Sequence, residues 1–298
     1  MNQNSRLFIL SAAMLSLASL GSLFPATALA DNARDWQNLP KDINLAFGYY
    51  DSMNVDAPGA DVDADVFLFR YAHTFDIDGR ITAIQIIQPY TRLSASLDNA
   101  PHLGNFENES LGDTQIVFAH GLFGNPALST SDFMRWTPEP FLTAAMWLTV
   151  PDGQYDKHQV LNSGANRWVF KPELAFGYPI GPVWLELNSW VSFYTDNDDY
   201  LGNNTLSQRP QYAGEGHISY TLSPALWVSL DGTWSGGGET KVNGAVQDNE
   251  QNNVILGTTL GFQLSPQFGG MIAWSDTVQH KTDSPDIDGW TFRLQYAW

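Results

Sequence analysis

A histidine and a serine two positions apart are the side chains of this sequence best placed for nucleophilic chemistry. His217 and Ser219 flank Ile218, so on an extended strand both side chains would point to one face. Catalysis by such a pair requires the histidine to deprotonate the serine hydroxyl, which makes a lipid-modifying enzyme one hypothesis. A polar network is the stronger interpretation, because Tyr212 and Tyr220 join Ile218 on the opposite, apolar face.

An acidic stretch, TDNDDY at 195–200, could instead bind a hard cation. Its carboxylate and amide oxygens are the ligands that calcium prefers. The spacing departs from the EF-hand loop, because neither the central glycine nor the final glutamate is in place. We therefore expect a solvated acidic loop, with no metal site and no cofactor.

Ionisable residues also recur at alternate positions within apolar segments. In NRWVFKPELAFGY (166–178), the charged residues share one face and most aromatic residues share the other. This separation would direct the charged groups toward an enclosed polar space. The candidate interior residues are Arg70, Arg167, Lys171, Glu173, Glu186, Glu215, His217, Asp231 and Arg293.

The elements that would position these residues are β-strands. Apolar and polar residues alternate with a period of two, and helical periodicity is almost absent. After residue 30, no apolar run approaches the roughly 20 residues of a membrane helix. The clearest strand segments are 43–50, 67–72, 166–178, 183–194, 212–222, 226–234, 253–264, 268–274 and 291–298, while 80–93 and 112–123 are strand-like without an assignable face.

Short and long connections alternate along the chain, which predicts about twelve strands with short turns at one end and long loops at the other. Short turns are expected at 76–80, 179–182, 222–225 and 264–267, with a longer one near 124–139. Long polar loops are expected near 51–64, 94–111, 151–166, 195–210, 236–252 and 278–288.

The first 30 residues resemble a secretory signal peptide. Arg6 precedes an apolar run that closes on Ala28-Leu29-Ala30, which predicts cleavage before Asp31 and export from the cytoplasm. Residues 31–41 are then expected to form a short periplasmic tail; a plug folded into the interior is the alternative. The net charge of −18 argues against nucleic-acid binding.

Two architectures could carry this alternation: a soluble β-sandwich and a transmembrane antiparallel β-barrel over residues 42–298. The alternating loop lengths, the even strand number and the aromatic residues near strand ends favour the barrel. Open strand edges are not viable in lipid, so the last strand must pair with the first. TFRLQYAW (291–298), which ends on Trp298, would be this closing strand.

Several motifs in the second half of the chain resemble an outer-membrane family named for the meta-pathway of phenol degradation, whose members are often described as transporters. They are Pro151-x-Gly153-x-Tyr155-Asp156, Asn166-Arg167-Trp168, Thr195-Asp196-Asn197-Asp198-Asp199 and Gln208-x-Pro210. The resemblance covers most of residues 140–298. It implies a barrel in the outer membrane and uptake of hydrophobic or aromatic compounds. The loop residues that carry it are Tyr155, Asp156, Asn166, Asp196, Asn197, Asp198 and Asp199.

The sequence therefore predicts a passive outer-membrane channel for small hydrophobic or aromatic solutes. The interior charges would form either a mixed-charge constriction or structural ion pairs, with the acids reaching across the lumen to Arg70, Arg167, Lys171 or Arg293. Trp184 and Trp190 are candidate stacking sites. A lipid-modifying barrel enzyme and a structural barrel with partner-binding loops are the alternatives. The expected partners are outer-membrane lipids, lipopolysaccharide, the barrel assembly machinery and the solute.

Overall fold

The structure, a computed structural model, describes residues 31–98, 102, 104–282 and 284–298. The signal peptide expected at 1–30 lies outside these residues. Among the residues that are described, none of the helices is long and apolar enough to cross a membrane.

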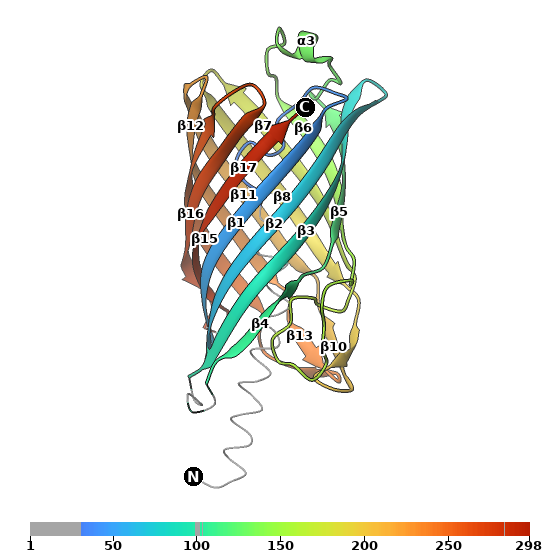
Figure 1. Cartoon of the computed structure of the whole chain (residues 1–298), viewed down its shortest axis with the longest axis vertical. Coiled ribbons are helices and arrows are strands. Elements are labelled where there is room, and N and C mark those ends of the chain that lie inside the picture. Colours follow the sequence, from blue (N-terminus) through green and yellow to red (C-terminus); the bar gives the residue numbers. More distant parts are fainter. Residues whose placement is uncertain (1–30, 99–101, 103, 283) are drawn as a thin grey trace.

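The chain forms one closed antiparallel β-barrel (Figure 1). Two strands, β4 and β5, pair with successive parts of β3, so the wall contains 12 strands. Pairing of the first strand with the last closes the wall. The expected all-β barrel of about twelve strands is thus confirmed, and the sandwich alternative is wrong. The wall strands are β1 (Asn44–Ala57), β2 (Ala60–Ile77), β3 (Arg80–Leu97), β4 (Phe106–Leu111), β5 (Gln115–Phe123), β6 (Phe141–Thr149), β7 (Val169–Ile180), β8 (Val183–Tyr194), β11 (Gln211–Ser223), β12 (Leu226–Gly237), β15 (Gln251–Gln263), β16 (Phe268–His280) and β17 (Asp286–Ala297).

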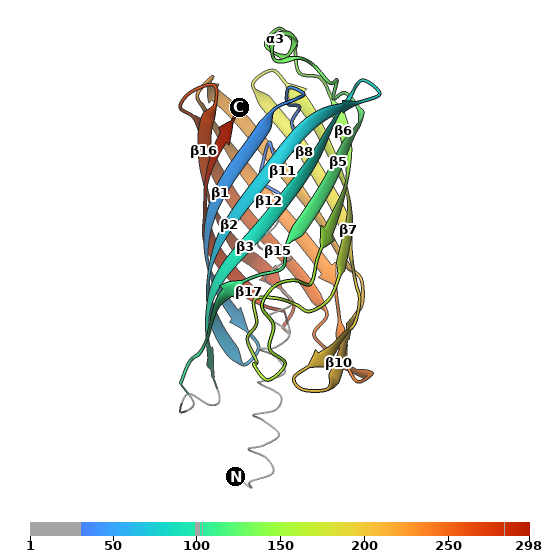
Figure 2. The same cartoon turned by 45° about the vertical axis from the view of Figure 1, so that its right-hand side comes forward.

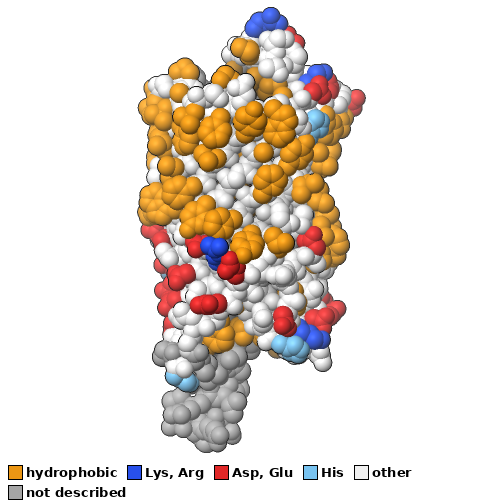
Figure 3. Space-filling view, viewed as in Figure 1, with side chains coloured by type: hydrophobic (Ala, Val, Ile, Leu, Met, Phe, Trp, Pro, Cys, Tyr) orange, Lys and Arg blue, Asp and Glu red, His pale blue; other side chains and the backbone are white. Residues whose placement is uncertain are grey.

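The last strand shows how alternation builds this wall. Phe292, Leu294 and Tyr296 are exposed on the outside, whereas Arg293 is buried inside. Apolar side chains form a broad band over the outer surface (Figure 3), as a lipid-facing wall requires. Trp298 completes the closure, since its N–H donates to the Asn44 carbonyl at 3.0 Å and its carbonyl accepts from the Asn44 N–H at 2.9 Å.

The two ends of the barrel differ. The C-terminus, α3 (Thr130–Phe133) and most of the tight turns lie at one end, which we call the turn end (Figure 2). The long connections gather at the other, the loop end, where four short strands form a second sheet. These strands are β9 (Asn197–Tyr200), β10 (Asn204–Gln208), β13 (Thr240–Val242) and β14 (Ala245–Val246).

The segment 51–64, expected to be a loop, instead continues the wall. β1 and β2 meet at a tight turn whose Gly59 has a φ of 90°. Buried alanine and valine side chains line the inner face of this hairpin. Its outer face is acidic, with Asp61, Asp63 and Asp65 in a row. These acidic residues therefore belong to a part of the β-strands that extends beyond the apolar outer band. β2 and β3 each contain 18 residues, against 12 in β7 and β8.

Between β4 and β5 the wall is interrupted, and a loop is fastened to it there. The Asp113 carboxylate accepts hydrogen bonds from the backbone N–H of Gly153 at 2.9 Å and of Ala165 at 2.8 Å. A Cβ on Gly153 would lie 2.6 Å from the carbonyl carbon of Gly112, so no larger side chain fits. The glycine of the Pro151-x-Gly153 motif thus allows the loop to contact the wall backbone.

Candidate functional site

The candidate site is the interior of the barrel, and a segment expected outside occupies part of it. Residues 31–43 run within the barrel, where Trp36 packs edge-on against Trp147 with ring centroids 6.4 Å apart. At the turn end, the Lys41 N–H donates to the Leu128 carbonyl at 2.9 Å. The expectation of a periplasmic tail is therefore wrong. Its short length does not keep the segment outside, because it turns inward directly before β1.

Two arginines of the wall meet an aspartate of this segment. Arg293 on β17 forms an ion pair with Asp35 at 2.5 Å, and Arg70 on β2 lies 3.6 Å from the other carboxylate oxygen. Arg70 also donates to Gln85 at 2.5 Å. Both guanidinium groups lie over the Phe47 ring, 5.2 and 5.8 Å from its centroid. Asp35 thus compensates two buried cations from different strands.

A neighbouring contact involves the other face of the segment. The Arg34 side chain donates to the hydroxyls of Ser219 at 2.9 Å and Thr221 at 2.9 Å, both on β11. Its backbone N–H donates to the Glu186 carboxylate at 3.0 Å. Among the described residues, no hydrogen bond joins Ser219 to His217. The two side chains share the inner face as expected, but each contacts a different partner, Arg34 for Ser219 and Asp231 for His217.

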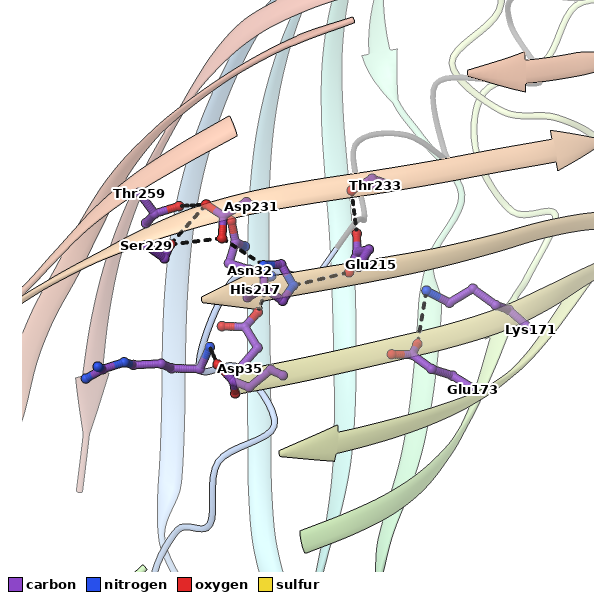
Figure 4. Close-up of polar contacts among 12 residues, drawn as sticks. Asn32, Asp35, Lys171, Glu173, Glu215, His217, Ser229, Asp231, Thr233 and Thr259 are labelled. Atoms are coloured by element: carbon purple, nitrogen blue, oxygen red, sulfur yellow. Dashed lines mark hydrogen bonds and ion pairs between the residues drawn. The ribbon is translucent and has the colours of Figure 1, made fainter. Parts of the chain in front are cut away.

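His217 is instead the centre of an acidic group on β11 and β12 (Figure 4). Its Nδ1 lies 2.8 Å from the Asp231 carboxylate, directly opposite in the ladder, and its Nε2 lies 3.7 Å from Glu215. Ser229 and Thr259 donate to Asp231 at 2.9 and 2.7 Å. The expectation that these acids reach across the lumen to arginines is wrong, because a histidine between them is nearer.

Lys171 and Glu173 form an ion pair within β7, at 3.3 Å (Figure 4). The Lys171 ammonium also lies 4.1 Å from the ring centroid of Trp147 and 4.6 Å from that of Trp190. Cation–π contacts of this kind stabilise a buried ammonium. Trp184 packs against Phe141 at 6.0 Å, so only Trp190 of the two predicted stacking residues borders open space.

That open space is a cavity of about 190 Å³ on the inner face. Aliphatic and aromatic side chains, including Leu68, Ile87, Trp147 and Trp190, make up much of its wall. About half of the lining residues are polar or charged, among them Asp31, Glu215 and His217. A cavity that combines apolar surface with polar groups suits a small apolar or aromatic molecule that also carries a polar group.

Arg167 differs from the other predicted interior residues. It precedes β7 at the loop end, where it is 2% exposed. Its guanidinium lies 4.5 Å from the centroid of the Tyr194 ring and donates to Gln208 at 2.5 Å. The other eight candidates, Arg70, Lys171, Glu173, Glu186, Glu215, His217, Asp231 and Arg293, lie on wall strands with their side chains turned inward.

The predicted loop motif residues form hydrogen bonds with one another and with neighbouring loop residues. Asn197 accepts from Asn166 at 2.9 Å and donates to the Tyr155 hydroxyl at 3.0 Å. Asp199 binds the Lys157 ammonium at 3.0 Å. Asp156 accepts from the His158 N–H and Asp198 accepts from the Thr205 hydroxyl, whereas Asp196 is exposed. Within the described ranges, no group of three or more His, Cys, Asp or Glu is placed to hold a metal ion.

Sequence reasoning considered segment 31–41, with Trp36, as a plug but favoured a tail, and it did not predict the contacts of this segment with the wall. Arg34, Asp35 and Trp36 contact the wall, and a tryptophan between charged residues in so short a segment was the available signal. It also missed Asp51, which is buried on the inner face of β1. This residue fell within the segment expected to be a loop.

Comparisons with known proteins agree with this architecture. A family model described as "Putative MetA-pathway of phenol degradation" matches residues 46–286. No curated protein matches the sequence. Among solved structures, the COG4313 outer membrane channel from Pseudomonas putida F1 superposes with a TM-score of 0.79 at 20% identity, covering 90% of this chain and 100% of that one.

More distant barrels share the fold alone. The translocator domain of the autotransporter NalP from Neisseria meningitidis has a TM-score of 0.53 at 8% identity, covering 94% of this chain and 98% of that one. The β domain of the Bordetella autotransporter BrkA has a TM-score of 0.51 at 11% identity, covering 86% and 99%. Because the family model spans far more than half of the sequence, this chain belongs to the MetA-pathway of phenol degradation family of β-barrel proteins.

Proposed function

We propose that this barrel is an outer-membrane channel through which small hydrophobic or aromatic molecules enter by passive diffusion, without a cofactor. The observation that carries the proposal is the cavity on the inner face, with its aliphatic and aromatic wall. The similar channel from Pseudomonas putida supports it, as does the family description.

The outer membrane is the proposed location. The closed wall and its apolar outer band suit a bilayer, and aromatic residues such as Trp290 and Tyr296 suit its interfaces. We further propose that residues 1–30 are a signal peptide that is removed before Asp31. The turn end, with the C-terminus, would then face the periplasm, and the loop end would face outward toward lipopolysaccharide.

Assembly would depend on the closing strand. The exposed side chains of β17 form an aromatic and apolar stripe that ends at Trp298, and we propose that the barrel assembly machinery binds it. Replacing Trp298 with Asp is expected to reduce membrane insertion and leave aggregates in the periplasm. Normal assembly of this variant, measured by heat-modifiable migration in gels, would contradict the proposed role.

Transport can be tested with a variant of Trp190, which borders the cavity and makes a cation–π contact with Lys171. Trp190→Ala should at least double or halve the flux of an uncharged aromatic solute into proteoliposomes, because it changes the cavity wall. Its effect on a small sugar should be weaker. Trp234→Ala is the matched control, since Trp234 is exposed on the outer surface.

Three outcomes would count against the proposal. The parent barrel could pass no aromatic solute, both tryptophan variants could behave alike, or sugars could pass as readily as aromatics. Phospholipid hydrolysis that disappears in Ser219→Ala would instead support the enzyme hypothesis, although Ser219 binds Arg34 rather than His217.

A further inference from the structure

Three buried carboxylates, those of Asp31, Glu173 and Glu215, gather inside the barrel where the described chain begins. Asp31 comes from the N-terminal segment, Glu173 from β7 and Glu215 from β11. Glu173 is 3% exposed and Glu215 is 1% exposed. The Asp31 carboxyl shares a side-chain hydrogen bond with the Glu173 carboxyl, and it also interacts electrostatically with Lys171 and Glu215. The group therefore unites two strands of the wall with the segment inside it.

These carboxylates lack enough donors among the described residues. Apart from the contact between the Asp31 and Glu173 carboxyl groups, both oxygens of Glu173, one oxygen of Asp31 and one of Glu215 accept no hydrogen bond there. A buried carboxylate without partners is costly, because it has lost water and gained nothing in return. The oxygens are thus placed to accept from a group that the described side chains do not supply.

The neighbouring cations do not fill this need. Lys171 forms an ion pair with Glu173 at 3.3 Å, but its ammonium also lies over two tryptophan rings. His217 lies 3.7 Å from Glu215 and shares its ring with Asp231 at 2.8 Å. Arg70 and Arg293 are engaged by Asp35. Three carboxylates therefore share one lysine and part of one histidine.

We propose that the missing group is this chain's own α-ammonium, created when the peptide bond before Asp31 is cut. Hydrolysis adds one water across that bond, leaving a carboxylate on Ala30 and an ammonium on Asp31. The backbone nitrogen of Asp31 then carries a positive charge and three N–H donors. The proposed site is an ammonium-binding pocket formed by Glu173, Glu215 and the Asp31 side chain.

The contacts of the following residues hold Asp31 at this place. Asp35 is fixed by two arginines, and it accepts from the backbone N–H of Asn32 at 3.3 Å. The backbone N–H of Arg34 is fixed by Glu186. Only a few bonds separate these fixed residues from the Asp31 nitrogen. The ammonium therefore lies near the carboxylates whether or not solute is present.

The inference rests on the proposed removal of residues 1–30, although it does not require that the barrel conduct. Export and cleavage should therefore be checked first, by mass spectrometry of the protein purified from outer membranes. A mature chain that begins at any residue other than Asp31 would overturn the inference. Conductance, measured separately, would not decide it.

The decisive measurement is the rate at which a small acylating reagent modifies the α-amine. In the folded parent at neutral pH, the rate should be at least about tenfold below that of the urea-unfolded chain, because one pKa unit changes the free amine about tenfold. The double variant Glu173→Gln with Glu215→Gln should recover most of this rate. Glu107→Gln with Glu139→Gln, which removes two exposed carboxylates, should not.

Burial alone would also slow acylation, and the double variant separates the two causes. If its amine stays as slow as that of the parent, enclosure accounts for the protection and the inference is wrong. If the variant fails to fold, Gly-Ser inserted directly before Asp31 replaces it, because the insertion moves the amine away from the pocket. A folded insertion variant should acylate much faster than the parent, and an unchanged rate would contradict the pocket.

Discussion

Two groups of buried charges inside the barrel are neutralised by partners from different parts of the chain. The group at Asp35 joins Arg70 and Arg293 to a residue that belongs to no wall strand. The group at His217 joins Glu215 and Asp231 through a partner on the same pair of strands. The first depends on an acid of the N-terminal segment, whereas the histidine and both acids of the second belong to wall strands. Variants of the first group should thus change both the free energy of unfolding and the conductance of the lumen. Variants of the second group should change the free energy of unfolding alone.

Asp35→Ala should have the largest effect, because it leaves two buried arginines without their carboxylate. We expect a loss of about 3 kcal/mol in the free energy of unfolding, at the lower end for a broken buried ion pair since water can enter the lumen. Conductance in planar bilayers should rise as the segment is released. A variant with the stability and conductance of the parent would show that the segment is held by other contacts.

Arg293→Ala should have a smaller effect, because Arg70 remains beside Asp35. We expect higher single-channel conductance or a shifted ion preference, together with a modest loss of stability. Leu294→Ala is the control, since this exposed side chain lies on the outer surface and should alter stability only. If Arg293→Ala conducts like the parent, this arginine lies outside the constriction.

His217→Ala tests the group whose histidine and acids all lie on wall strands. Asp231 keeps the hydroxyls of Ser229 and Thr259, so the loss in free energy of unfolding should be about 1–2 kcal/mol. Conductance should remain close to that of the parent because the N-terminal segment keeps its anchors. His158→Ala, in an exposed loop, should change neither. A conductance increase equal to that of Asp35→Ala would remove the proposed distinction.

Lys41→Gln provides the smallest expected effect, since its ion pair with Asp76 at 3.0 Å is exposed. The hydrogen bond that Lys41 donates to Asp76 raises the pKa of Lys41. The pair therefore contributes stability below the unfolded lysine pKa of about 10.4, and this contribution fades as pH rises through the folded value. Urea midpoints of parent and variant should converge at high pH. A gap that persists or widens there would mean that the lysine acts by packing.

Much of the wall was predictable because strand alternation is a local property. The faces of β17 follow from eight successive residues, and Arg293 and Trp298 lie where alternation places them. The hairpin 51–64 was misjudged because its outer face is acidic, which imitates a loop, while alternation with buried valines and alanines continues beneath it. The acidic composition of this segment suggested a loop, whereas its period-two alternation would have predicted a strand.

The interior was harder to predict, because its contacts join residues far apart in the chain. Asp35 and Arg293 are 258 positions apart, and no local pattern reports their proximity. The pairing of His217 with Asp231 could have been predicted more easily from the sequence. A tight turn at 222–225 sets the register of the hairpin and brings these two residues opposite each other. Turn position therefore predicts partners on adjacent strands but not those supplied by the N-terminal segment.

The tall hairpins of β1, β2 and β3 also fix how deeply the barrel is immersed. On the outer face of β2, aromatic Phe67 and Phe69 give way within one step to Asp65, Asp63 and Asp61. Charged carboxylates are costly in hydrocarbon, so this boundary limits how far this side of the barrel can lie within a bilayer. The six additional residues of β2 relative to β8 amount to roughly 20 Å of strand at about 3.3 Å each. Wall strands therefore extend the loop end on one side, whereas the sheet of β9, β10, β13 and β14 extends it on the other (Figure 1), so the two sides of the mouth are built from different elements.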